Sequence, residues 1–253
     1  MRFSANLGFL WADLPLPDAI HAAKDHGFDA VECHWPYAFD PGDVRAALTA
    51  TGLTMLGLNT ARGDVDAGEN GLSALPERID DARAAIDAAL AYARAIDAQN
   101  IHVMAGFASG PDAHQVFVEN LRYACTAAAS QGATILIEPL NRHDAPGYFL
   151  QTADQAVRIL DAVAMPNIKL MFDCYHVQMM EGDLSHRLAA LKDRIGHIQF
   201  ASVPDRGAPD HGEVNYAHVF EVIRSLGYDQ PLGAEYKPNG PTVQTLNWLT
   251  HWR

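Results

Sequence analysis

Four polar residues in the second half of the chain stand at the ends of short apolar runs. They are Glu138 in TILIEPL, Asp173 in IKLMFDC, Gln199 in HIQFAS and Glu235 in LGAEYKP. One such carboxylate is often only the N-cap of the following helix. Three carboxylates and an amide are harder to explain in that way, because burying them together is costly without a cation. Oxygen ligands suit Mg²⁺ or Mn²⁺ rather than Zn²⁺, so the pattern predicts a site for one divalent metal ion.

These residues belong to a regular alternation of strand-like and helix-like segments. Strands are predicted at 3–8, 29–35, 54–60, 100–106, 134–140, 168–174, 195–202 and 230–237. Helices are predicted between them, at 17–26, 40–51, 76–97, 112–130, 152–163, 183–193, 215–225 and 241–252. The clearest is 76–97, which has Pro76 near its start, an acidic first turn and apolar residues at three- and four-residue steps. Gly132 is predicted to end the helix at 112–130.

Eight strand–helix units predict an α/β fold, a (β/α)8 TIM barrel that occupies residues 1–253 as one domain. An open doubly wound sheet is the alternative, but the sequence contains neither GxGxxG nor GxxxxGK[ST]. In barrels the chemistry takes place at the carboxyl ends of the strands. The predicted metal site lies at those ends.

The composition limits the partners of the chain. Its net charge of −13 repels phosphate backbones and anionic membrane surfaces, so neither nucleic acid nor a membrane is an expected partner. A small anionic substrate remains compatible if a metal or a local cation compensates for its charge. No apolar run has the length of a membrane span, the start lacks a signal-peptide pattern, and the three cysteines form no CxxC pair. We therefore expect a cytoplasmic protein with reduced thiols, and the sequence leaves homo-oligomerisation open.

The chain resembles the hydroxypyruvate isomerase family, which includes 2-oxo-tetronate isomerases and belongs to the xylose-isomerase-like TIM barrels. Short strings in a fixed order carry the resemblance: RFSANL (2–7), VECHWPY (31–37), GDVDAGENG (63–71), VENLRYA (118–124), IEPLN (137–141), FDCYHVQMMEG (172–182), IGHIQFAS (195–202), HGEVNY (211–216) and EYKP (235–238). The chain departs from the family pattern at 33–35, where Cys-His-Trp stands, and at Val65 and Asn70. These departures bear on the identity of the substrate more than on the chemistry.

The resemblance implies that Glu138, Asp173, Gln199 and Glu235 are the metal ligands. It also implies that Glu138 and Glu235 form an acid/base pair and that His176 contacts the substrate or supports the site. An aldose–ketose shift moves a proton between neighbouring carbons through an enediolate, and a divalent ion stabilises the charge on its oxygens. Two glutamates from non-adjacent strands can flank the substrate and transfer that proton.

The substrates of such enzymes are small carboxylates, so a cation is expected near the metal. Arg206 and Lys237 are the candidates, and each has an alternative interpretation as a solvated surface charge. On an alternating strand Lys237 would point to the same side as Glu235. His102 and Asn59 are candidates for lining the pocket, although a role in the core is as good an interpretation for both. His34 could also line the site.

Three other functions compete with the sugar-acid isomerase. A ketose 3-epimerase on the same barrel would have a histidine where this chain has Gln199. A DNA-repair endonuclease of the same fold would need a histidine-rich zinc site and a basic groove. A non-catalytic barrel would bind a sugar acid without turnover, but degenerate enzymes usually lose ligands and this set is complete.

Overall fold

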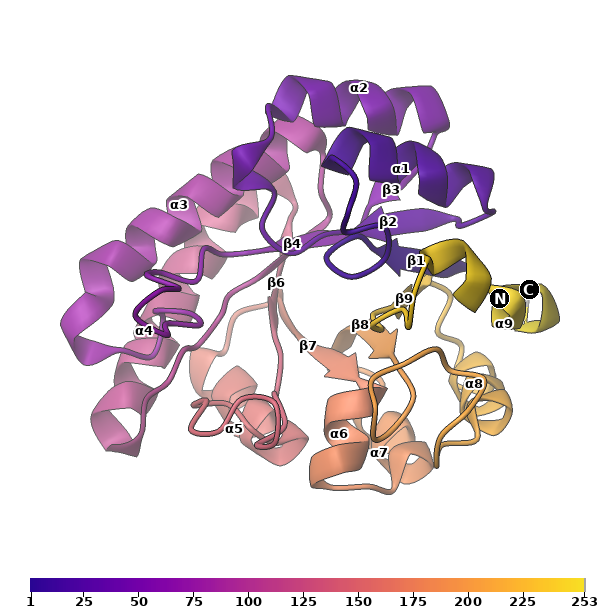
Figure 1. Cartoon of the computed structure of the whole chain (residues 1–253). Helices are drawn as coiled ribbons and strands as arrows, with labels where there is room; N and C mark the ends of the chain where they lie inside the picture. The colour runs from indigo at the N-terminus through magenta and orange to yellow at the C-terminus, as the bar shows by residue number, and fades with distance from the viewer. Residues whose placement is uncertain (253) are drawn as a thin grey trace.

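A closed ring of short parallel strands forms the centre of the molecule, and helices surround it (Figure 1). A computed structural model describes residues 1–252. Its strands are β1 (Phe3–Asn6), β2 (Ala30–Glu32), β3 (Thr54–Met55), β4 (Gly57–Asn59), β5 (Asn100–His102), β6 (Thr134–Ile137), β7 (Ile168–Asp173), β8 (Ile195–Phe200) and β9 (Leu232–Ala234). All pair in parallel, in the order β3-β2-β1-β9-β8-β7-β6-β5-β4. The predicted barrel is confirmed.

Most strands are shorter than their predicted ranges, and one predicted strand is divided in two. The run at 54–60 forms two pieces, β3 and β4, which are interrupted at Leu56 and lie at the two ends of the strand order. Leu56 N–H donates to Val31 O (2.7 Å), and Cys33 N–H donates to Gly57 O (3.1 Å). Because β3 and β4 are consecutive, these two contacts to β2 and its extension close the ring.

The helices lie close to their predicted ranges. They are α1 (Leu16–Asp25), α2 (Pro41–Thr51), α3 (Ile79–Ile96), α4 (Gly110–Ala128), α5 (Ala153–Val163), α6 (Cys174–Met180), α7 (Leu184–Leu191), α8 (Tyr216–Ser225) and α9 (Asn247–Trp252). Four 3₁₀ turns accompany them: η1 (Pro36–Ala38), η2 (Pro76–Arg78), η3 (Ala129–Gln131) and η4 (Thr242–Thr245). Two predicted helices therefore begin with 3₁₀ turns, at 76 and 242. The short helix α6 was not predicted, because it follows β7 without an intervening loop.

Helix α3 shows how the sequence builds the outer layer. Its buried residues Ala82, Ile86, Ala89 and Ala93 recur at three- and four-residue steps, which gives the helix one apolar face toward the strands. Beyond α4, the turn η3 ends at Gly132 in the left-handed conformation (φ +68°), as the sequence predicted. The apolar face of α3 therefore packs against β4 and β5.

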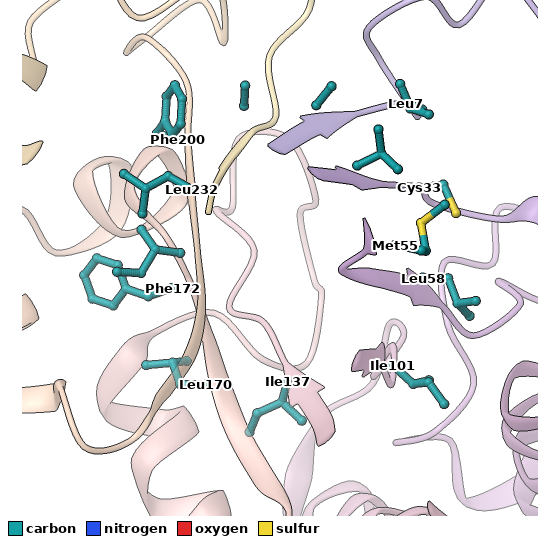
Figure 2. Packing of buried hydrophobic residues seen from close by; sticks show 14 of the residues in the cluster. Leu7, Cys33, Met55, Leu58, Ile101, Ile137, Leu170, Phe172, Phe200 and Leu232 are labelled. Atoms are coloured by element: carbon teal, nitrogen blue, oxygen red, sulfur yellow. The ribbon is translucent and has the colours of Figure 1, made fainter. Parts of the chain in front are cut away.

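Alternation along the strands separates two environments. On β7 and β8 the apolar residues Leu170, Phe172 and Phe200 belong to the hydrophobic core, part of which is drawn in Figure 2. His197 and Gln199 on β8 alternate with these apolar residues, and both bond to Glu32 on β2 across the interior of the ring. The inside of the barrel therefore contains polar side chains beneath the predicted site.

Two further predictions concern location. Within residues 1–252, no helix combines the length and the apolar character that crossing a bilayer requires. The cysteines Cys33, Cys125 and Cys174 are buried free thiols. Burial raises the pKa of the Cys125 thiol to about 12 and raises that of Cys33 further, so neither forms a thiolate at neutral pH.

Candidate active site

The predicted ligands come together at the carboxyl ends of neighbouring strands. Glu138 directly follows β6, Asp173 is the last residue of β7, Gln199 lies near the end of β8, and Glu235 directly follows β9. Asp173 pairs in register with Gln199, which pairs in turn with Gly233 on β9. All four ligand candidates are at most 5% exposed. All four residues therefore lie at the carboxyl end of the barrel, where oxygens of Glu138, Asp173 and Glu235 come within 4.8 Å of one another.

Three of these residues have an oxygen that the protein does not satisfy. Glu138 Oε1, Asp173 Oδ2 and Gln199 Oε1 are buried and accept no hydrogen bond from any residue between 1 and 252. The other oxygen of Asp173 accepts from Tyr175 N–H (2.9 Å) and so caps α6. Leaving buried acceptors unpaired is costly. A hard divalent cation would satisfy all three, so the donor set fits Mg²⁺ or Mn²⁺.

His176 lies beside these oxygens, and its hydrogen bonds show which role it can take. One atom each from Glu138, Asp173, Glu235 and His176 lie within 4.8 Å of one another. His176 Nδ1 accepts from Asn141 N–H (3.0 Å), so this nitrogen carries no proton. Burial and Arg206 lower the pKa of His176 well below its ordinary value, so the ring is neutral and its proton is on Nε2. A protonated Nε2 donates and cannot coordinate, which favours Gln199 as the fourth ligand.

Charge governs the behaviour of the carboxylates. Burial, together with the neighbouring carboxylates, raises the pKa of Asp173 to about 8 and that of Glu138 well above its ordinary value. Burial alone would also raise the pKa of Glu235, but Arg206 and His34 hold it well below the ordinary value. The two glutamates of the predicted acid/base pair therefore have opposite environments. A divalent cation among these groups would favour their ionised forms.

Glu235 is held at both oxygens. His34 Nε2 donates to Glu235 Oε1 (2.8 Å), and so does Asn6 Nδ2 (3.0 Å). Arg206 Nη2 donates to Glu235 Oε2 (2.6 Å) and lies 3.8 Å from Asp173 Oδ2. His34, which the sequence analysis left open, is thus next to a predicted catalytic group.

The two predicted cations differ in their surroundings. Arg206 lies in the loop after β8 with φ +55°, and its guanidinium is about 5 Å from the ring centroids of Phe9 and Tyr175. Lys237 is exposed, and its ammonium is 6.0 Å from the Phe9 centroid. Because β9 ends at Ala234, strand alternation does not carry Lys237 inward as expected. Of the two, Arg206 is the cation that contacts the site.

His102 and Asn59 lie below the four ligand candidates. His102 Nδ1 is 3.5 Å from Glu138 Oε2, and burial lowers the pKa of this histidine to about 3, so it is neutral. Asn59 borders a small internal cavity of about 20 Å³ that His102 also lines. Both face the interior of the barrel, and their roles in binding substrate stay predictions.

Sequence reasoning missed three polar residues inside the barrel, which are Asn6, Glu32 and His197. All are buried and contact one another or the predicted ligands. One signal was available. His197 precedes Gln199 by two residues, so both point to the same face of β8.

Comparison with known proteins identifies relatives along the whole chain. The sequence profile of the Xylose isomerase-like TIM barrel family matches residues 20–252. A 2-oxo-tetronate isomerase of Cupriavidus necator is 46% identical, and the alignment covers 98% of this chain and 97% of that protein. The hydroxypyruvate isomerase of Escherichia coli is 37% identical over the full length of both chains.

Solved structures show the same architecture. A Brucella melitensis structure described as an AP endonuclease, family 2, has a TM-score of 0.96 at 38% identity, covering 100% of this chain and 99% of that one. A 3-keto-D-glucoside 4-epimerase of Escherichia coli has a TM-score of 0.80 at 21% identity, covering 98% of each chain. The likeness to the epimerase shows a shared fold only.

Proposed function

This chain belongs to the xylose isomerase-like TIM barrel family, as the resemblance predicted, and we propose that it is a metal-dependent isomerase of small sugar acids. The substrates that we propose are hydroxypyruvate, giving tartronate semialdehyde, or a 2-oxo-tetronate. One observation carries the proposal: buried, unpaired oxygens of Glu138 and Asp173 lie beside Glu235, and Gln199, which pairs in register with Asp173, has an unpaired oxygen as well. The names of two relatives that align along the whole chain agree with it.

The two glutamates are in position to transfer the proton. They follow β6 and β9, which β7 and β8 separate in the ring, so they can flank a small substrate. One takes a proton from the hydroxyl-bearing carbon and the pair returns a proton to the neighbouring carbonyl carbon, while the hydroxyl proton moves to the former carbonyl oxygen. A divalent cation held by the four ligands would supply Lewis-acid polarisation of the substrate.

Arg206 and His176 would orient the substrate. Arg206 is charged, mostly buried and flanked by two aromatic rings, which suits recognition of a planar carboxylate. His176 directs its Nε2 proton toward the carboxylate cluster and can donate to a substrate oxygen. Fixing the acid at two points places its C–H bond against a glutamate.

The alternatives have less support from the residues of the site. An AP endonuclease activity, as named for the Brucella melitensis relative, needs a surface that attracts DNA, and this chain has a net charge of −13. The structures of sugar epimerases share only 18–22% sequence identity with this chain, and their likeness shows the fold alone. A barrel that only binds a sugar acid would not need two glutamates in opposite electrostatic environments.

The buried free cysteines also support the cytoplasmic location that the sequence predicted.

A substrate panel tests the proposal. Metal-loaded protein is incubated with hydroxypyruvate, a 2-oxo-tetronate and a free ketohexose in deuterated water, and products are followed by NMR. We expect isomerisation of at least one acid with deuterium at the carbon that receives the proton. Epimerisation of the ketohexose alone, or Mn²⁺ binding without turnover of any compound, would overturn the proposal.

A further inference from the structure

A carboxylate that takes no part in the proposed reaction lies beneath the site. Glu32 ends β2 and is 4% exposed. His197 Nε2, on β8, donates to Glu32 Oε2 at 2.5 Å. In the ring, β1 and β9 separate β2 from β8, so this contact crosses the interior of the barrel. A buried carboxylate is costly unless its acceptors are satisfied, and here every donor comes from the inside of the barrel.

The second oxygen of Glu32 accepts from two amides that lead to the site. Gln199 Nε2 donates to Glu32 Oε1 (3.2 Å), and Asn6 Nδ2 donates to the same atom (3.3 Å). Asn6 Nδ2 also donates to Glu235 Oε1 (3.0 Å). A single carboxylate oxygen therefore contacts one predicted ligand directly and a second one through Asn6.

This arrangement fixes which end of the Gln199 amide faces the metal site. An amide has a donor end and an acceptor end, and an ionised carboxylate only accepts. If the amide were reversed, Gln199 Oε1 would face Glu32 Oε1 and two acceptors would meet. With Nε2 bound to Glu32, the unpaired Oε1 is left for a cation. Asn6 is fixed similarly, because its Oδ1 accepts from Gly8 N–H (2.9 Å).

Gly233 provides an independent sign that this cluster is built into the fold. A Cβ at residue 233 would overlap Glu32 Oε1 and would lie 2.8 Å from Gln199 Cγ and 2.9 Å from His197 Nε2. The φ angle of Gly233 is not positive, so backbone conformation does not require a glycine there. The space on β9 is instead taken by the three side chains of the cluster.

We propose that Glu32, held by His197, is a positioning residue that orients the Gln199 amide so that its oxygen coordinates the divalent metal. This inference rests on the metal site of the proposed function. Groups that orient metal ligands typically change metal affinity by about 10- to 100-fold when they are removed.

Mn²⁺ alone is the probe for the test, titrated calorimetrically into metal-stripped protein. Glu32→Leu removes both acceptors and is expected to weaken Mn²⁺ binding by at least about 10-fold. Glu32→Gln keeps one acceptor and should restore much of the affinity. Glu181→Leu is the matched control, because Glu181 is a similarly buried carboxylate outside the cluster, where it pairs with Arg187 (3.0 Å) and accepts from Ala153 N–H (2.7 Å). Equal losses in Glu32→Leu and Glu181→Leu would overturn the proposal.

A double-mutant cycle separates positioning from general damage. In a Gln199→Leu background the amide is gone, so Glu32→Leu should weaken Mn²⁺ binding by less than about threefold further. A full additional loss would show that Glu32 does not act through Gln199. If Glu32→Leu fails to fold, Gly233→Ala disturbs the same cluster with a single methyl group and should also weaken Mn²⁺ binding. Unchanged Mn²⁺ affinity in Gly233→Ala would contradict the inference.

An NMR measurement keeps the inference testable without metal or substrate. The side-chain amide protons of Gln199 should exchange slowly in metal-free protein and rapidly in Glu32→Leu. Rapid exchange in both the unsubstituted protein and Glu32→Leu would contradict the positioning role, even if the isomerase assay succeeds. Slow exchange and Mn²⁺ binding with no turnover of sugar acids would leave the role of Glu32 intact and count against the proposed function only.

Discussion

At the scale of single residues, the site combines carboxylates of the same chemical type with opposite tendencies to hold a proton. Arg206 and His34 keep Glu235 ionised, whereas burial favours the protonated form of Glu138. Such divergence is typical of groups that divide acid and base roles. It arises from the neighbours of each carboxylate, and those neighbours come from segments far apart in the sequence.

The roles of the two glutamates lead to the first prediction. Glu138→Gln and Glu235→Gln keep the shape of each side chain but remove the group that transfers the proton. Each substitution should lower kcat by at least about 10², measured with whichever acid the panel identifies. Glu181→Gln is the control and should keep kcat within about threefold. Near-normal turnover in both site variants would refute the assignment.

Arg206 leads to a second prediction, which concerns recognition. Lysine keeps the charge but lacks the planar fork and the stacking between Phe9 and Tyr175. Arg206→Lys should lower kcat/KM for the acid by at least about 10-fold, mainly by raising KM. Arg187→Lys is the control, because Arg187 pairs with Asp154 and Glu181 and contacts none of the predicted site residues in these ion pairs; it should have little effect. A normal KM in Arg206→Lys would show that another cation binds the carboxylate of the substrate.

The sequence predicted these residues unequally well. The three carboxylates were predictable because an acidic residue directly after an apolar run is visible in the sequence itself. They are Glu138, Asp173 and Glu235. The orientation of Lys237 was not, because it depended on where β9 ends. Glu32 and His197 could not be paired from the sequence, since 165 positions separate them and only the curvature of the ring brings them together.

At the scale of elements, two of the loops that follow the strands are in close contact with each other. The loop after β4 meets the loop after β5 at a bridge between Gly71 and Ala105. A Cβ at Gly106 would overlap Gly71 O and would lie 2.6 Å from Leu75 Cδ1. Positive φ at Gly106 (+93°) adds a conformational requirement for glycine.

Gly106→Ala should therefore destabilise the protein by more than conformational strain alone. Strain from positive φ costs about 1–2 kcal/mol, and overpacking adds about 1–3 kcal/mol. Gly227→Ala is the matched control, because its φ is also positive (+79°) but open space surrounds the added Cβ among the described residues. In urea unfolding, Gly106→Ala should lose more free energy of unfolding than Gly227→Ala. Equal losses would show that the two loops move apart to accommodate the added methyl group.

The loop that carries Arg206 has its own pH dependence. Asp205 and Asp210 raise the pKa of His211 by accepting its hydrogen bonds. A raised pKa means that this stabilisation is complete below the ordinary histidine value and is lost as pH rises through the folded-state value. His211→Gln should therefore lower the urea midpoint more at pH 5.5 than at pH 9. An equal effect at both pH values would contradict the ion pair.

Element boundaries were predictable where the periodicity was long, as in α3. Helix α6 was missed because it follows β7 without a loop. Asp173 is both the last residue of β7 and the N-cap of α6, and its second oxygen faces the site. From the sequence, such a residue is either the N-cap of a helix or a metal ligand. In the structure one residue has the geometry for both.

At the scale of the whole molecule, metal binding should be linked to stability. A cation that binds only the folded chain stabilises it by about 2.7 kcal/mol at a concentration 100 times Kd. For a chain of this size that corresponds to a rise in Tm of roughly 5–10 °C. Differential scanning calorimetry with and without Mn²⁺ checks this. Asp173→Ala should abolish the shift, and a shift that persists in this variant would place the ion elsewhere.

The most direct test of the account is a crystal structure of the Mn²⁺-loaded protein, with diffraction recorded at the manganese absorption edge. We predict one anomalous peak within about 2.0–2.3 Å of oxygens from Glu138, Asp173, Gln199 and Glu235, with His176 Nε2 outside the coordination sphere. A peak bound through His176 instead of Gln199, or one at another place in the barrel, would contradict the account.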